Sequence, residues 1–287
     1  MVLKGCGTAL VTPFRDGKVD WEALERLVRR QVQAGVDFLV PLGSTAETPC
    51  LEDEEKVDVL RLVKSLSGGK PVVAGCGTNS LTATLRNIRL LSSLGPDAFL
   101  VVVPYYNKPT QEGMYQYFKA VSEATDIPIV LYNVPGRTGA DLLPATALRL
   151  AQLPGIIAVK EASGNIPHIR EILAGRPDGF AVLSGNDDQT LELMQAGADG
   201  VISVASNLAP QRMKALTDAA LSGEWDQARS LDAALKPLYE ACFVESNPIP
   251  VKAGLSLQGY CTAEMRLPLT PAVEGTFEIL RRVLETE

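Results

Sequence analysis

One lysine ends an apolar run in the middle of the chain. Lys160 follows Ile156–Val159, and that run offers no counter-charge of its own. Long charged side chains are seldom buried unpaired. Desolvation would favour the neutral amine, which can attack a ketone and form a Schiff base. The alternative is an ion pair of Lys160 with Glu161 or Asp187.

Three further segments carry side chains suited to the same chemistry. Tyr132 ends another apolar run, and its hydroxyl could pass protons while a Schiff base forms; an aromatic cap is the alternative. Ser44 and Thr45 could relay protons or hold a carboxylate, although hydroxyls after a strand are often turn or N-cap groups. Arg137, between two glycines, could grip a substrate carboxylate through two hydrogen bonds, or be a solvated loop residue.

The elements that must position these residues alternate between strand and helix. Short β-branched runs end in small or polar residues and are followed by stretches with helical apolar spacing. The strand spacing is close to the ~30 residues of a β-helix-β unit. The predicted strands are Gly7–Val11, Phe38–Leu42, Pro71–Gly75, Ala98–Val103, Pro128–Tyr132, Ile156–Lys160, Phe180–Ser184 and Gly200–Val204.

Eight such units predict an α/β fold, a (β/α)8 TIM barrel. A doubly wound sheet is the alternative, but the chain has no G-x-G-x-x-G turn. The first helix is expected to begin after an N-cap at Asp20 and end at Gly35. The others are predicted at Glu54–Leu66, Leu81–Leu94, Gln111–Ala124, Pro144–Gln152, Ile166–Leu173 and Asp188–Gln195.

The barrel units end near Gly223, so we predict a catalytic barrel over residues 1–223 and a C-terminal helical domain over residues 224–287. Within the second domain, helices are expected at Glu224–Ala241 and Pro271–Leu284, joined by a Pro-rich segment at residues 246–250. The active site of such a barrel lies at the carboxyl ends of its strands. We therefore expect Lys160 and Tyr132 to meet at one mouth.

Composition excludes several classes of partner. The formal net charge is −7 and no block of like charges occurs, so neither nucleic acid nor an anionic membrane is an expected partner. No apolar run approaches the ~20 residues of a membrane span. Five cysteines form no C-x-x-C pair, which favours buried reduced thiols and a cytoplasmic protein. The only histidine, His168, is expected on a helix surface or in packing, and no metal site is predicted.

Six motifs together resemble one enzyme family over nearly the whole chain. They are Gly7–Phe14, Gly43–Glu47, Pro104–Pro109, Tyr132–Gly139, Lys160–Gly164 and Asn247–Lys252. The family is that of dihydrodipicolinate synthase, also called 4-hydroxy-tetrahydrodipicolinate synthase, within the pyruvate-dependent class I aldolases and lyases.

The resemblance implies four catalytic residues. Lys160 would form the Schiff base with pyruvate, and Tyr132 would donate and accept protons. Ser44 and Tyr106 would complete a hydroxyl relay, with Tyr106 reaching into the site of a neighbouring subunit.

The same resemblance implies substrate-binding residues. Thr45 and the backbone near Ile202 would hold pyruvate, Gly185 would lie beside it, and Arg137 would receive the carboxylate of L-aspartate 4-semialdehyde. The implied enzyme is a cytoplasmic lyase of lysine and diaminopimelate biosynthesis that condenses the two substrates to 4-hydroxy-tetrahydrodipicolinate. It would need no cofactor or metal and would be a homotetramer, a dimer of dimers.

Two other functions remain open. A sister lyase or aldolase could cleave N-acetylneuraminate or a 2-keto-3-deoxy sugar acid through the same lysine, although Arg137 favours a substrate with an amino-acid carboxylate. A non-catalytic barrel that senses pyruvate-like ligands would leave the lysine, tyrosine and serine set without a purpose.

Two residues depart from the family pattern, and a third group bears on regulation. The family commonly has Thr at the place of Ser44 and Gly at the place of Ala46, so the loop shape is in question. Family members that L-lysine inhibits strongly carry histidines where Asp53 and Lys56 stand and a glutamate at or near Ala83. We therefore expect weak inhibition by L-lysine.

Overall fold

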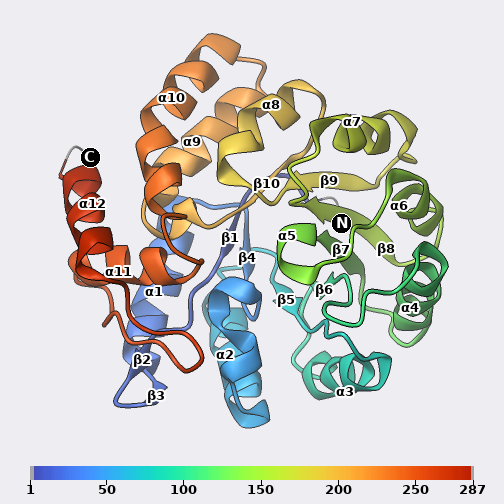
Figure 1. Cartoon of the computed structure of the whole chain (residues 1–287), viewed down its shortest axis with the longest axis horizontal. Helices are drawn as coiled ribbons and strands as arrows, with labels where there is room; N and C mark the ends of the chain where they lie inside the picture. The colour runs from blue at the N-terminus through green and yellow to red at the C-terminus, as the bar shows by residue number, and fades with distance from the viewer. Residues whose placement is uncertain (1–2, 286–287) are drawn as a thin grey trace.

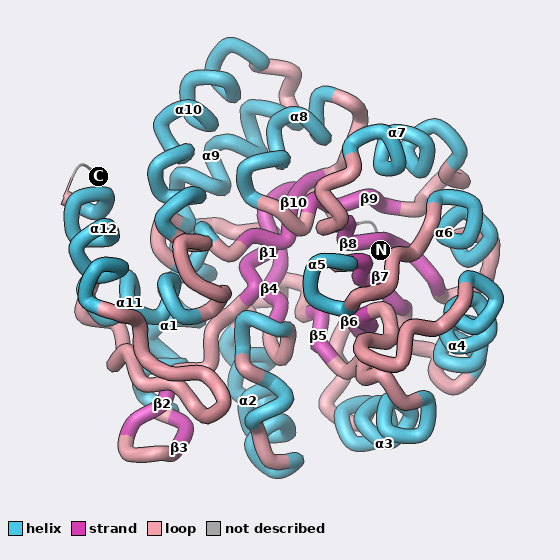
Figure 2. The backbone as a smooth tube through the Cα atoms, in the orientation of Figure 1, coloured by secondary structure: helices cyan, strands magenta, loops and turns pink. Residues whose placement is uncertain are grey.

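Eight parallel strands form the centre of the molecule in the computed structural model, which describes residues 3–285 (Figures 1 and 2). The strands run in the ring order β4-β1-β10-β9-β8-β7-β6-β5. Their bounds are β1 (Gly5–Ala9), β4 (Phe38–Val40), β5 (Val73–Gly75), β6 (Ala98–Val102), β7 (Ile129–Asn133), β8 (Ile156–Glu161), β9 (Ala181–Ser184) and β10 (Gly200–Ser203). A two-stranded hairpin, β2 (Phe14–Arg15) and β3 (Lys18–Val19), follows the first of them.

Backbone contacts between β4 and β5 close the ring. Leu39 and Val72 form a parallel bridge, and the Gly75 N–H donates to the carbonyl oxygen of Pro41 over 3.0 Å. Closing the sheet satisfies backbone groups that an open edge would leave to solvent. The (β/α)8 barrel predicted from the spacing is confirmed, and each of the eight predicted strand positions holds a strand within a few residues of its expected bounds.

Helices surround the strands on the outside of the ring (Figure 1). They are α1 (Trp21–Ala34), α2 (Asp53–Leu66), α3 (Leu81–Ser92), α4 (Gln111–Glu123), α6 (Pro144–Leu150), α7 (Ile166–Gly175), α8 (Thr190–Gln195) and α9 (Pro210–Leu221). The first helix shows why the chain folds locally as predicted. Asp20 caps it by accepting from the Ala23 N–H over 3.0 Å, and Gly35 ends it in the left-handed conformation at φ 84°.

The two faces of the strands build two separate cores. Side chains that point into the ring, such as Val40, Leu100, Val130 and Ala158, form one buried cluster, and those that point to the helices form a larger one. Because side chains alternate along a strand, one register decides which residue reaches the barrel interior. This alternation determines which polar residues face the site.

Three helices extend the chain beyond the barrel, at one side of the ring in Figure 1. They are α10 (Trp225–Ala241), α11 (Ile249–Leu257) and α12 (Glu274–Leu284). Helix α10 packs on α9 of the barrel, and α12 packs on both α10 and α11. The predicted Pro-rich connection is partly wrong, since Ile249 already begins α11 with Pro250 in its first turn. The domain boundary at residue 223 stays a proposal.

The cysteines match the prediction only in part. None of the five is in a disulfide in the described structure, but Cys50 and Cys261 are half-buried whereas Cys6, Cys76 and Cys242 are buried. Burial raises the pKa of the Cys261 thiol to about 11. Within residues 3–285, no helix is both long and apolar enough to cross a membrane.

Candidate active site

Lys160 and Tyr132 lie side by side at the top of the barrel interior. The two residues are register partners on β8 and β7, so both side chains point into the ring. The Nζ of Lys160 lies 4.2 Å from the centroid of the Tyr132 ring. Lys160 is 4% exposed and Tyr132 7% exposed. Lys160 and Tyr132 therefore lie together at one mouth of the barrel, as the barrel prediction required.

The next residue on each of these strands faces the other way. Asn133 and Glu161 are buried among the helices, where the Asn133 Nδ2 donates to Oε2 of Glu161 over 3.1 Å. The same Nδ2 donates to Asp141, and Glu161 accepts from the Ser163 N–H. Burial raises the pKa of Glu161 despite these hydrogen bonds. Asn133 and Glu161 directly follow the ends of two predicted strands, where site residues are expected. Their side chains instead hold the loops after β7 and β8 and do not reach the site.

Neither ion pair considered for Lys160 forms in the described part of the chain. Glu161 turns outward to Asn133, and Oδ2 of Asp187 accepts the backbone N–H groups of Val204 and Ala205 over 3.0 and 2.9 Å. Asp187 is 2% exposed, and its burial raises the pKa of its carboxyl. Within residues 3–285, the amine of Lys160 therefore lies beside an aromatic ring and has no salt-bridge partner.

Gly185 lies directly against the lysine. A Cβ placed on it would come within 3.1 Å of Cε of Lys160 and 2.6 Å of Cβ of Ala162. A side chain at this position would displace the lysine or close the space around it. Ile202, on β10, is buried in the same interior cluster as Tyr132. Gly185 therefore borders Lys160, and Ile202 shares the barrel interior with Tyr132.

The loop after β4 brings two hydroxyls to the mouth. Ser44 and Thr45 lie in the short 3-10 helix η1 (Ser44–Ala46). Ser44 is half-buried and lines a cavity, whereas Thr45 is buried and its Oγ1 accepts from Nδ2 of Asn247 over 2.9 Å. Ala46 is not left-handed: the positive φ values fall on Leu42 at 60° and Glu47 at 53°. The alanine that departs from the family pattern therefore fits this loop without backbone strain.

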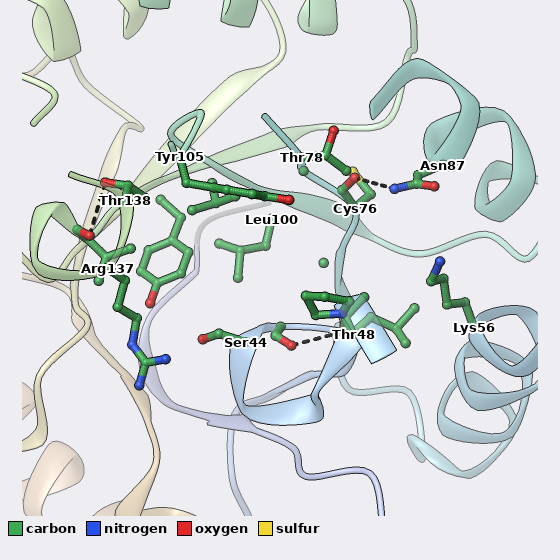
Figure 3. A pocket seen from close by; sticks show the side chains of 18 residues that line it. Ser44, Thr48, Lys56, Cys76, Thr78, Asn87, Leu100, Tyr105, Arg137 and Thr138 are labelled. Carbon is green, nitrogen blue, oxygen red and sulfur yellow. Dashed lines mark hydrogen bonds between the residues drawn. The ribbon is translucent and has the colours of Figure 1, made fainter. Parts of the chain in front are cut away.

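Tyr132 lines a cavity of about 320 Å³. Figure 3 shows this cavity from close by. Its walls come from the ends of β4, β5, β6 and β7, as expected for a barrel mouth. Most of the wall is apolar, with hydroxyls from Ser44, Thr48 and Tyr105 and a guanidinium from Arg137. Lys56 lines it on the side away from Arg137 (Figure 3). Such a space suits a small polar molecule with an anionic group.

Arg137 is held at the rim by the C-terminal segment. It lies in the one-turn helix α5 (Pro135–Thr138), which Gly139 ends at φ 71°. The loop predicted around Arg137 is therefore partly helical. The NH2 group of Arg137 donates to the carbonyl oxygen of Asn247 over 3.0 Å. The side chain lines the cavity and stays exposed, so its other N–H groups can reach an anion.

Tyr106 is the one predicted catalytic residue outside this arrangement. Its side chain is 88% exposed and its backbone is left-handed at φ 72°. The neighbouring Tyr105 lines the cavity instead. A left-handed, nearly fully exposed tyrosine is unusual and needs an explanation outside its own barrel.

Sequence reasoning missed the role of Asn247, which binds both Thr45 and Arg137 although it lies in the C-terminal extension. Its position just before Pro248 in a Pro-rich segment indicated only a turn. The buried Lys252 inside the apolar helix α11 was a stronger signal, because a lone charge in such a run needs a partner.

Comparisons with known proteins agree along the whole chain. Residues 2–287 match the model of the dihydrodipicolinate synthetase family. A 4-hydroxy-tetrahydrodipicolinate synthase from Thermotoga neapolitana is 50% identical over 289 residues, which cover 99% of this chain and 98% of the relative.

Solved structures give the same result. Dihydrodipicolinate synthase from Thermotoga maritima superposes with a TM-score of 0.98 at 47% identity, covering 100% of this chain and 99% of that one. The chloride-inhibited synthase from Acinetobacter baumannii, solved in complex with pyruvate, gives a TM-score of 0.96 at 42% identity, with 98% of each chain covered. The chain therefore belongs to the dihydrodipicolinate synthetase family.

Proposed function

We propose that this chain condenses pyruvate with L-aspartate 4-semialdehyde to give 4-hydroxy-tetrahydrodipicolinate. One observation carries the chemistry: among the described residues, the buried amine of Lys160 has no carboxylate partner and lies beside Tyr132, which lines a cavity that also holds the Arg137 guanidinium. The family supplies the pair of substrates, and the pyruvate complex of the Acinetobacter baumannii relative supports pyruvate as the first. The reaction makes the protein a lyase of lysine and diaminopimelate biosynthesis.

The first half of the reaction uses the amine and the hydroxyls. The neutral Nζ of Lys160 attacks C2 of pyruvate, and the carbinolamine loses its hydroxyl as water to leave an imine. Tyr132 is the proton donor and acceptor in these steps, and Ser44 extends its relay. Loss of a proton from C3 turns the imine into an enamine. Thr45 and the backbone at Ile202 hold the carboxylate of pyruvate, and Gly185 leaves room for its methyl group.

The second half joins the substrates and frees the enzyme. Arg137 holds the carboxylate of the semialdehyde through charge-assisted hydrogen bonds. The enamine carbon attacks the aldehyde carbon, whose oxygen takes a proton and becomes the hydroxyl of the product. The amino group of the semialdehyde then attacks C2, Lys160 leaves as the free amine, and the ring closes. One water is released for each pair of substrates.

Assembly completes the proposed relay. We propose a homotetramer made of two dimers, in which Tyr106 enters the site of the neighbouring subunit. The exposure and left-handed backbone of Tyr106 support a role that its own barrel does not provide. We propose the cytoplasm as the location of the enzyme.

A coupled assay tests the reaction. The wild-type protein is given pyruvate with L-aspartate 4-semialdehyde, and in parallel pyruvate with a sugar-acid aldehyde. We expect turnover with the semialdehyde and at least a hundredfold lower kcat/KM with the sugar-acid aldehyde, because Arg137 is placed for a carboxylate. Turnover preferring the sugar-acid aldehyde would assign the chain to the sister lyases. Lys160→Met should abolish turnover, which controls for contaminating activity.

A further inference from the structure

A salt bridge with no exposed atoms joins the loop after β4 to the C-terminal extension. The Nζ of Lys252, on α11, lies 2.7 Å from Oε1 of Glu47, and both side chains are 0% exposed. The other carboxylate oxygen of Glu47 accepts the backbone N–H of Arg266 over 3.1 Å. The same ammonium lies 4.1 Å from the centroid of the Phe14 ring. Each charge therefore has partners from segments that are distant in the sequence.

The salt bridge contacts the loop after β4 at a residue with an unfavourable backbone conformation. Glu47 has φ 53° and follows directly after η1, which carries Ser44 and Thr45. Leu42, just before the loop, has φ 60°. Non-glycine residues keep a left-handed backbone only where the surroundings hold them there. Glu47 is held through both of its carboxylate oxygens.

A second contact reaches the same loop from the same part of the chain. Asn247, five residues before Lys252, donates from Nδ2 to Oγ1 of Thr45, while its carbonyl oxygen accepts from Arg137. The segment from Asn247 to Lys252 therefore touches the loop at two points and the proposed carboxylate-binding residue at a third. These contacts make the C-terminal extension part of the wall behind the site.

Stability alone does not account for a pair of this kind. Removing two charges from water costs so much that apolar side chains of similar size are often equally stable or more stable. Burial also lowers the pKa of Lys252, although Glu47 opposes that shift. What an ion pair adds over an apolar contact is direction, since it fixes the positions of two groups relative to each other.

We propose that Glu47 and Lys252 are positioning residues, which hold the loop after β4 so that Ser44 and Thr45 meet pyruvate at Lys160. The inference rests on the proposed function, because it concerns the rate at which that site forms its pyruvate adduct. Neither residue lines the cavity in the described structure, so both act through the loop.

The test compares four variants with the wild type. They are Glu47→Gln, Lys252→Met, the double variant Glu47→Gln/Lys252→Met, and Arg176→Met as a matched control. Arg176 forms a partly buried salt bridge with Asp199, which precedes β10 at the amino end of the barrel, away from the mouth. Three quantities are measured for each: the melting temperature, the rate of borohydride-trapped pyruvate adduct, and kcat/KM.

Each single variant leaves one buried charge unpaired, so its melting temperature should fall. The double variant has no unpaired charge and keeps an acceptor for the Arg266 N–H, so it should melt closer to the wild type than either single variant. Its adduct formation should nevertheless be at least tenfold slower. Arg176→Met should melt lower than the wild type while its adduct rate and kcat/KM change by less than twofold.

Two results would overturn the inference. One is a folded double variant whose adduct rate and kcat/KM both stay within threefold of the wild type. The other is a loss of rate that follows the melting temperature in all variants, the control included. If the double variant does not fold, Lys252→Gln replaces it, with the same threefold limit at a temperature where it is fully folded. Failure of the proposed function is seen separately, in a wild-type protein that forms no adduct or does not condense the semialdehyde.

Discussion

Two lysines of this chain are buried inside the fold, and their neighbours decide which of them can react. Lys252 is fully buried and its ammonium is bound to Glu47. Lys160 is 4% exposed, lies over the ring of Tyr132, and has no carboxylate partner in the described residues. A bound, inaccessible ammonium cannot act as a nucleophile, whereas the amine of Lys160 lies against Tyr132, which lines the cavity.

Borohydride in the presence of pyruvate should therefore modify Lys160 alone. The expected result is one covalent adduct per chain, located by peptide mapping in the segment that contains residue 160, and none without pyruvate. Lys160→Met should remove the adduct. An adduct at Lys56, which lines the cavity, or at Lys252 would disprove the assignment of the nucleophile.

Tyr132→Phe should slow catalysis without unfolding the barrel. The ring would still pack in the interior cluster, but the hydroxyl that passes protons would be gone. General acid-base groups contribute ~10²- to 10⁴-fold to a rate, so kcat should fall by at least ~100-fold. The melting temperature should stay close to that of the wild type. A kcat within fivefold of the wild type would show that another group moves the protons.

Arg137→Leu should impair the second substrate far more than the first. Losing a charge-assisted contact costs on the order of 1.5–3 kcal/mol, which is a loss of roughly 10-fold to 150-fold. That loss is expected in kcat/KM for the semialdehyde, measured at saturating pyruvate. The rate of pyruvate adduct formation should change little, because Arg137 lies at the rim. Wild-type kcat/KM for the semialdehyde would mean that its carboxylate is bound elsewhere.

Lys160, the proposed nucleophile, was the most predictable residue of the site, because a charged residue at the end of an apolar run is unusual in any fold. The inward or outward direction of its neighbours was not predictable, since a shift of one residue in register would have exchanged Lys160 with Glu161. The contacts of Asn247 were also not predictable from the sequence. Its two contacts join residues about 110 and 200 positions away, and nothing local encodes them.

At the scale of elements, local signals placed most of the barrel. Asp20 and Gly35 bound α1 through cap geometries that depend only on neighbouring residues. Helix α5 and helix α11 were not predicted, because local sequence signals do not specify them. α5 is a single turn, and α11 begins among prolines that favour a loop in isolation, while contacts with the rest of the molecule stabilise its helix.

The pair of Glu55 and Arg266 ties α2 to the segment between α11 and α12, and it should make stability depend on pH. Two hydrogen bonds of 2.6 Å from the Arg266 guanidinium lower the pKa of the Glu55 carboxyl, although partial burial opposes the shift. A carboxyl with a lowered pKa in the folded state adds stability above its unfolded value of ~4.3, and that part is lost as pH falls through the folded value.

Arg266→Gln should therefore be less stable than the wild type at neutral pH, and the gap should narrow below about pH 4. Part of the gap should persist, because Arg266 also donates to the carbonyl oxygens of Cys50 and Gly17. Denaturant unfolding across this range measures the difference in the free energy of unfolding. Arg61→Gln, which removes an exposed pair with Asp58, is the control and should differ little from the wild type. A gap that widens in acid would contradict the prediction.

At the scale of the whole molecule, the cavity extends from Tyr132 to Lys56, one of the residues on which the expected weak inhibition by L-lysine depends. Lys56 and Tyr105 line it together with Ser44 and Tyr132. A ligand bound near Lys56 would therefore lie close to the reacting groups, and the charges around Lys56 decide whether an amino acid can bind there.

Those charges are already satisfied within the chain. Nζ of Lys56 lies 2.9 Å from Oδ1 of Asp53, whose other oxygen is 3.8 Å from the guanidinium of Arg86. Lys56 lowers the pKa of the Asp53 carboxyl through this hydrogen bond. Asp53 was the one group that could have received the ammonium of L-lysine in place of the missing glutamate. It is instead engaged by two cations of its own chain.

L-lysine should accordingly be a weak inhibitor. Ala83 offers only a methyl group, and Thr84 is fully buried with its hydroxyl bound to that of Tyr117 over 2.8 Å, so neither can replace a carboxylate. The like charge of Lys56 adds about 1 kcal/mol of repulsion at close range in a wet site. A titration of L-lysine in the steady-state assay should show no half-inhibition below millimolar concentration, and Ala83→Glu should increase the sensitivity. Half-inhibition of the wild type at submillimolar L-lysine would mean that Asp53 leaves Lys56 and Arg86 to bind the ligand.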